Sequence, residues 1–70
     1  MELFEGTVIE APAGEKNGKI KEDEGGTIGE FVRGNIKDIV DGDRYSFLKI
    51  IQETPNGDKV MRILKKRLPE

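Results

Sequence analysis

The sequence predicts an all-β fold, a five-stranded antiparallel barrel that occupies residues 1–70 as a single domain. Nine glycines in 70 residues indicate many turns, and therefore short strands rather than long helices. Short apolar segments with alternating polar neighbours recur at a spacing of roughly 8–12 residues, which is typical of small barrels. Because so short a sheet shelters little core and exposes its edges, we expect it to close on itself.

Five segments carry this strand pattern, in the order of three short strands, a longer connection and a final hairpin. They are residues 4–9, 18–21, 28–33, 45–51 and 60–64. In the second segment the alternation points Ile20 into the barrel and Lys19 and Lys21 outward. Gly6 in the first segment indicates a bulge or a close approach of another strand.

The connection at residues 34–43 is predicted to hold one turn of helix. Ile36, Ile39 and Val40 have the i, i+3, i+4 spacing that would turn one apolar face toward the barrel. The final hairpin is predicted to turn at residues 54–58, where proline presets φ and an Asn-Gly pair tolerates positive φ.

The aromatic side chains are expected to belong mainly to the core. Phe47 has alternating neighbours on a short strand, which favours burial, and Phe4 follows a weaker version of the same pattern. Tyr45 is expected to keep its hydroxyl group at the surface.

The composition argues against several classes of function. The chain contains no cysteine and no histidine, so it lacks disulfides, thiolate zinc ligands and the usual general base. We therefore expect no enzyme activity, no metal and no cofactor. The acidic residues 22–24 lack the spacing of a calcium loop and are interpreted as a turn. No signal-like or membrane-spanning apolar stretch is present, which predicts a cytoplasmic protein without membrane contact.

Charge is distributed unevenly along the chain. Residues 1–58 carry seven Lys or Arg against thirteen Asp or Glu, whereas residues 59–70 carry five against one. The acidic body argues against binding duplex DNA through charge alone. The basic end at residues 65–70 fits either a contact with phosphates or an acidic partner, or a solubilising end after the last strand.

The residues that build the barrel resemble the cold-shock domain family. The Gly-Thr-Val opening at residues 6–8, and Gly18 and Ile20, match the family pattern, which fits without a gap from Gly6 to Ile36. Further matches are Asp23, Gly25, Ile36, Gly42 and Phe47. The resemblance implies an OB-fold barrel that binds single-stranded nucleic acid by stacking bases on aromatic rings, at ~1–3 kcal/mol per base.

The chain departs from the family at the stacking positions. Where the family has base-stacking side chains, this sequence has Glu10, Ala11, Asn17, Lys19, Glu30, Val32 and Arg33. Phe31, the only aromatic residue in that part of the pattern, falls on a position that faces the core. The resemblance therefore extends to the scaffold and not to the aromatic binding face.

Four basic residues are the candidate nucleic-acid-binding site. Phosphates would contact Lys16, Lys19, Lys21 and Arg33, and the Arg33 guanidinium has the planar shape that stacks on a base. However, Glu10, Glu15 and Glu30 are expected near the same face, and mixed charge of this kind also fits a solvated surface.

Three functions remain open at this point. The first is a cold-shock-like module that binds single-stranded RNA or DNA weakly or with altered preference. The alternative is a protein–protein interaction module that uses the same face of the barrel without binding nucleic acid. The third is a domain that dimerises through an exposed barrel strand.

Overall fold

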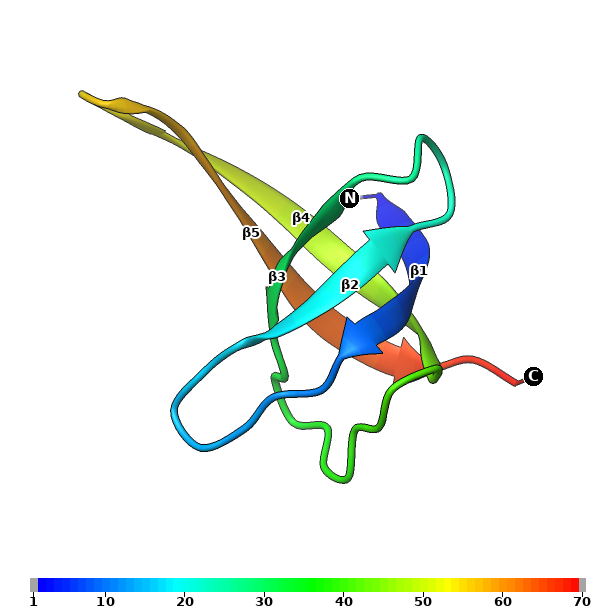
Figure 1. Cartoon of the computed structure of the whole chain (residues 1–70). Coiled ribbons are helices and arrows are strands. Elements are labelled where there is room, and N and C mark those ends of the chain that lie inside the picture. The colour runs from blue at the N-terminus through cyan, green and yellow to red at the C-terminus, as the bar shows by residue number, and fades with distance from the viewer. Residues whose placement is uncertain (1, 70) are drawn as a thin grey trace.

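A computed structural model describes residues 2–69, which form a closed barrel of five strands and no helix (Figure 1). The strands are β1 (Leu3–Glu10), β2 (Gly18–Glu22), β3 (Ile28–Val32), β4 (Arg44–Thr54) and β5 (Gly57–Arg67). Their order around the barrel is β1-β2-β3-β5-β4. The predicted fold class, a small OB-like β-barrel, is confirmed.

One pairing differs from the wholly antiparallel barrel that the sequence predicts. β3 and β5 are parallel, and they pair only at Phe31 with Arg62 and at Val32 with Ile63. The parallel direction follows from the connectivity, because β5 returns from the β4 hairpin in the direction in which β3 already runs. Every other pair of neighbouring strands is antiparallel.

The core consists of inward-facing residues from all five strands. The fully buried hydrophobic side chains are Val8, Ile20, Phe31, Tyr45, Phe47 and Leu64. The predicted alternation in β2 is confirmed, since Ile20 is buried whereas Lys19 and Lys21 are exposed. Gly6 marks a close approach, because a Cβ atom there would lie 2.5 Å from the carbonyl oxygen of Lys21.

The predicted helical turn between β3 and β4 is wrong. Gly34 and Asp38 have φ values of 60° and 58°, in the left-handed region, which interrupts a right-handed helix. Ile36 and Ile39 still pack against the core, but Val40 is 56% exposed. The apolar residues of this connection therefore cover the end of the barrel in an irregular conformation.

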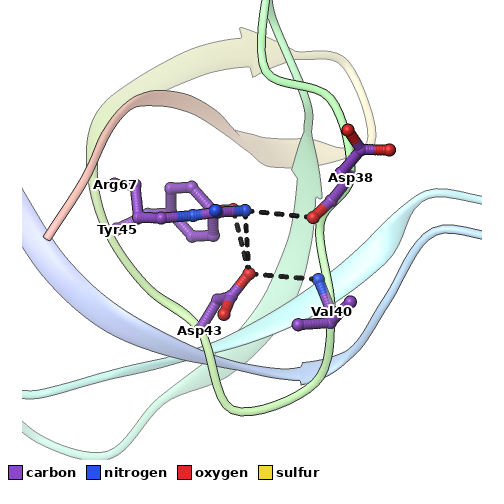
Figure 2. Close-up of polar contacts among 5 residues, drawn as sticks. All are labelled: Asp38, Val40, Asp43, Tyr45 and Arg67. Carbon is purple, nitrogen blue, oxygen red and sulfur yellow. Dashed lines mark hydrogen bonds and ion pairs between the residues drawn. The ribbon is translucent and has the colours of Figure 1, made fainter. Parts of the chain in front are cut away.

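A polar network fastens this connection to the ends of β4 and β5 (Figure 2). The Arg67 guanidinium donates hydrogen bonds to the Tyr45 hydroxyl oxygen, at 2.9 and 3.1 Å, and to the carbonyl oxygen of Asp38 at 3.0 Å. The Asp43 carboxylate accepts from the Tyr45 hydroxyl group and from the Val40 amide, both at 3.2 Å. Contrary to the sequence expectation, Tyr45 is fully buried. Arg67, from the basic end of the chain, is thus part of the structure that closes the barrel.

The β4–β5 hairpin is much longer than the sequence predicts and projects from the barrel (Figure 1). β1 pairs with β4 only as far as Leu48, and β3 pairs with β5 only at Arg62 and Ile63. Residues 50–61 therefore pair only with each other, and we call them the arm. The predicted turn is confirmed at its tip, where Thr54 pairs with Gly57.

Candidate interaction surfaces

Lys19 lies at the centre of the predicted nucleic-acid-binding strip, and carboxylates flank it on both sides. Its strand neighbours are Glu10 on β1 and Glu30 on β3. The Lys19 Nζ atom lies 3.8 Å from Glu10 Oε2, and both side chains are more than half exposed. Glu10, Lys19 and Glu30 therefore form a solvated row in which Lys19 pairs with Glu10 and two carboxylates accompany one cation.

The other three predicted site residues do not converge on one site. Lys16 lies in the β1–β2 turn and shares a shallow hollow with Lys19, and that hollow is also lined by Glu10, Glu15, Asn17 and Glu30. Lys21 faces outward further along β2, beside Thr7 and Ile28. Arg33 follows the end of β3 and is exposed. The structure therefore brings two of the four cations together, and it places them among three carboxylates.

A buried ion-pair cluster, which the sequence analysis missed, lies where the arm leaves the barrel. Glu22 accepts hydrogen bonds from Arg62 Nε at 2.8 Å and from Lys49 Nζ at 2.7 Å. Glu22 and Arg62 are only 5% and 6% exposed. Gly29 leaves room for the guanidinium, because a Cβ atom there would lie 2.0 Å from Arg62 Nη1. Lys49 Nζ also lies 4.9 Å from the centre of the Phe4 ring.

The electrostatics of this cluster favour an ionised Glu22. Burial acts to raise the pKa of Glu22, but the hydrogen bonds from Lys49 and Arg62 outweigh it and hold the pKa below its ordinary value. The cluster contains two cations and one carboxylate, so it carries an excess positive charge. Lys49 remains partly exposed, with 23% of its side chain accessible.

The acidic segment at residues 22–24 turns at Asp23 and Glu24, as predicted, whereas Glu22 is the last residue of β2. Asp23 binds Arg44 through two hydrogen bonds of 2.6 and 3.0 Å, and this lowers its pKa. Glu22 points into the barrel end, and Glu24 is exposed. Within residues 2–69, no group of three or more acidic side chains is placed to hold a metal ion.

The arm has two faces, and each carries exposed apolar residues. Cross-strand partners share a face, and successive rows alternate between the faces. The inner face continues the barrel interior beyond Phe47 and Leu64. Its first row, Lys49–Arg62, lies at the base of the arm, and the rows Ile51–Val60 and Glu53–Asp58 follow within the arm. The outer face begins with the row Leu48–Ile63 at the base of the arm and continues with the rows Ile50–Met61 and Gln52–Lys59.

These apolar side chains are accessible to solvent. Ile51 is 60% exposed, Ile50 is 40% exposed and Val60 is 38% exposed. On the outer face the apolar surface extends across neighbouring strands, because Leu3 pairs with Leu48 and is itself 55% exposed. The arm is therefore a two-stranded ribbon with exposed apolar side chains on both of its faces.

At the tip of the inner face, two carboxylates oppose each other directly. Glu53 and Asp58 are cross-strand partners, and both are exposed. Like charges in this position destabilise a strand pair. The arm therefore carries an exposed apolar pair next to an unfavourable acidic pair.

The fold defines this chain as a small OB-like β-barrel protein with a projecting β-ribbon. Comparisons with protein-family models, with curated proteins and with solved structures found no match. The resemblance to cold-shock domains therefore remains a prediction from the sequence. Residues 2–69 include no helix long and apolar enough to cross a membrane.

Proposed function

We propose that this chain is a protein–protein interaction module, and that the arm is its contact element. The observation that carries this proposal is the exposure of Ile50, Ile51 and Val60 on the two faces of a ribbon that pairs with no other strand of the barrel. A two-stranded hairpin is only marginally stable by itself in water. Contiguous exposed apolar surface on a folded protein is typical of interaction sites.

Backbone pairing strengthens the argument. In the arm, β4 beyond Leu48 and β5 before Arg62 pair only with each other. The opposite edge of each strand has no neighbouring strand among residues 2–69. Open strand edges accept extended chains from other proteins. The arm offers a partner both apolar side chains and unpaired backbone groups, whereas the row of Glu10, Lys19 and Glu30 offers only solvated charges of mixed sign.

Site-specific photo-crosslinking in the native cells tests this proposal. A photoreactive residue replaces Ile51 in the arm or, as a control, Asn35, which is exposed in the β3–β4 connection. We expect light-dependent adducts from position 51 that survive nuclease, disappear with protease and are absent from position 35. Adducts removed by nuclease, or equal adducts from both positions, would contradict the proposal.

Weak binding of single-stranded RNA or DNA is the second candidate function. The observation that favours it is that Lys16, Lys19 and Lys21 are all exposed on the β1–β2 side of the barrel. Fluorescence anisotropy with labelled single-stranded oligonucleotides measures it directly. Affinity of about 1 µM or tighter, falling steeply with salt, would favour this second function over the first.

A further inference from the structure

We propose that a second copy of this chain docks on the arm, inner face against inner face. This inference rests on the proposed function and names the partner of the same surface. It is carried by the order of the three rows on the inner face, which are cationic, apolar and anionic from the barrel toward the tip.

The pattern is self-complementary under a two-fold axis. If the axis passes through the Ile51–Val60 row, that row faces its own copy, because a two-fold interface uses the same patch on both subunits. The same rotation places the Glu53–Asp58 row of one copy over the Lys49–Arg62 row of the other. The rows are two residues apart on each side, so the spacing of the charges matches in both directions.

The docking also compensates charges that the single chain leaves unbalanced. At the base of the arm, Glu22 neutralises only one of the two cations, and Lys49 is still partly exposed. At the tip, Glu53 and Asp58 repel each other and bind no cation within residues 2–69 in any ion pair that the structure shows. Each copy therefore supplies at its tip the negative charge that the base of the other copy lacks.

The outer face does not have this property. A two-fold axis through its Ile50–Met61 row would place the charge of Lys59 against the apolar Leu48–Ile63 row. Burying an ammonium group against aliphatic side chains without a partner is unfavourable. The proposal therefore selects one face of the arm and predicts that the two faces respond differently to the same substitution.

Sedimentation equilibrium of the full chain, over a range of concentrations at low salt, tests the proposal. We expect the average mass of the wild type to rise from one chain toward two. Ile51→Thr, on the inner face, should weaken association by at least about tenfold. Ile50→Thr is the matched control, because it makes the same change at the neighbouring residue on the outer face and should leave association within about twofold.

A second pair of variants tests the charged rows. Glu53→Gln and Glu24→Gln each remove one exposed carboxylate and raise the net charge by one, the first on the inner face of the arm and the second in the β2–β3 turn. Glu53→Gln should weaken association and reduce its dependence on salt, whereas Glu24→Gln should change neither. All four substituted residues are exposed, so circular dichroism should show an unchanged fold.

A wild type that stays at the mass of one chain over the whole range would overturn the proposal. Equal weakening by Ile51→Thr and Ile50→Thr would also overturn it, because the docked face would not be the inner one. If one of these two results is combined with crosslinks from position 51 to a different protein, the proposed function would still stand. Only the second copy of the chain would be rejected as the partner.

Discussion

Arg62 and Glu22 connect two strands that are not neighbours in the barrel. Arg62 Nε on β5 donates a 2.8 Å hydrogen bond to Glu22 Oε2 on β2, with β3 lying between the two strands. Both side chains are about 95% buried. The ion pair therefore braces the end of the barrel from which the arm projects.

Loss of the Glu22 charge should destabilise the fold. Glu22→Gln leaves Arg62 and Lys49 without an ionised partner, and hydrogen bonds to charged groups contribute ~1.5–3 kcal/mol each. We expect the free energy of unfolding to fall by about 2 kcal/mol, a large share of the total for so small a domain. Urea denaturation measures the change.

Glu24→Gln is the control for that substitution, because Glu24 is the exposed acidic residue two positions further along. It should change stability by less than ~0.5 kcal/mol. Equal losses from Glu22→Gln and Glu24→Gln would show that the buried ion pair contributes nothing specific.

The lowered pKa values of Glu22 and Asp23 predict how stability depends on pH. A carboxyl group whose pKa is lower in the folded state stabilises the fold above its unfolded pKa, and this contribution is lost as the pH falls through the folded value. The ordinary values are 4.5 for Glu and 3.8 for Asp. We therefore expect the melting temperature to fall as the pH drops below about 4.5.

Between about pH 6 and 8 the melting temperature should stay constant, because the chain has no histidine to titrate there. Glu22→Gln should show a smaller loss on acidification than the wild type. A melting temperature that rises on acidification would contradict the lowered pKa values. So would a fall in melting temperature on acidification that is the same in Glu22→Gln as in the wild type.

The sequence predicted those parts of the fold that depend on neighbours in the chain. The alternation around Ile20 gave the correct faces of β2, and the Pro-Asn-Gly segment gave the correct hairpin turn. The three apolar residues after Gly34 suggested a helical turn, but a span this short also fits an irregular segment. Asp38 has a left-handed conformation, and its carbonyl oxygen accepts a hydrogen bond from Arg67, a distant residue that the local sequence does not reveal.

The candidate sites depended on residues that are distant in sequence, which explains why they were harder to predict. The sequence assigns Glu22 to an acidic turn. Its ion-pair partner Arg62 lies 40 residues later, so no local pattern reveals that Glu22 is buried. The sequence predicts that Lys19 lies on a face of mixed charge. Only the strand register shows that its direct neighbours are Glu10 and Glu30.

The buried hydroxyl group of Tyr45 should contribute measurably to stability. Tyr45→Phe removes the acceptor for Arg67 and the donor to Asp43 without changing the packing of the ring. We expect a loss of ~1 kcal/mol in the free energy of unfolding. Equilibrium urea unfolding followed by circular dichroism measures it, and a gain in stability would show that the network does not hold the barrel end together.

Gly18 is predicted to tolerate no side chain. A Cβ atom there would lie 2.5 Å from the carbonyl oxygen of Glu10 and 2.6 Å from Cζ of Phe31. Gly18→Ala should therefore cost about 2 kcal/mol, because backbone and a core ring must both shift. Gly25→Asn is the control, since no atom lies within 4 Å of its Cβ position and asparagine tolerates the left-handed conformation found there. A Gly18→Ala protein as stable as wild type would contradict the close packing of β1 and β2 against Phe31.

The flanking carboxylates, rather than a lack of cations, should limit any binding of single-stranded nucleic acid. The double variant Glu10→Gln with Glu30→Gln leaves Lys19 unneutralised, and we expect the affinity for a labelled oligonucleotide at low salt to rise about tenfold, or ~1.4 kcal/mol. Glu2→Gln with Glu24→Gln is the control, because it changes the net charge equally and neither residue lines the hollow that contains Lys19. If both double variants gain equally, net charge alone would explain the effect. If neither gains, Lys19 would not be a phosphate contact, and the row of Glu10, Lys19 and Glu30 would be a solvated surface.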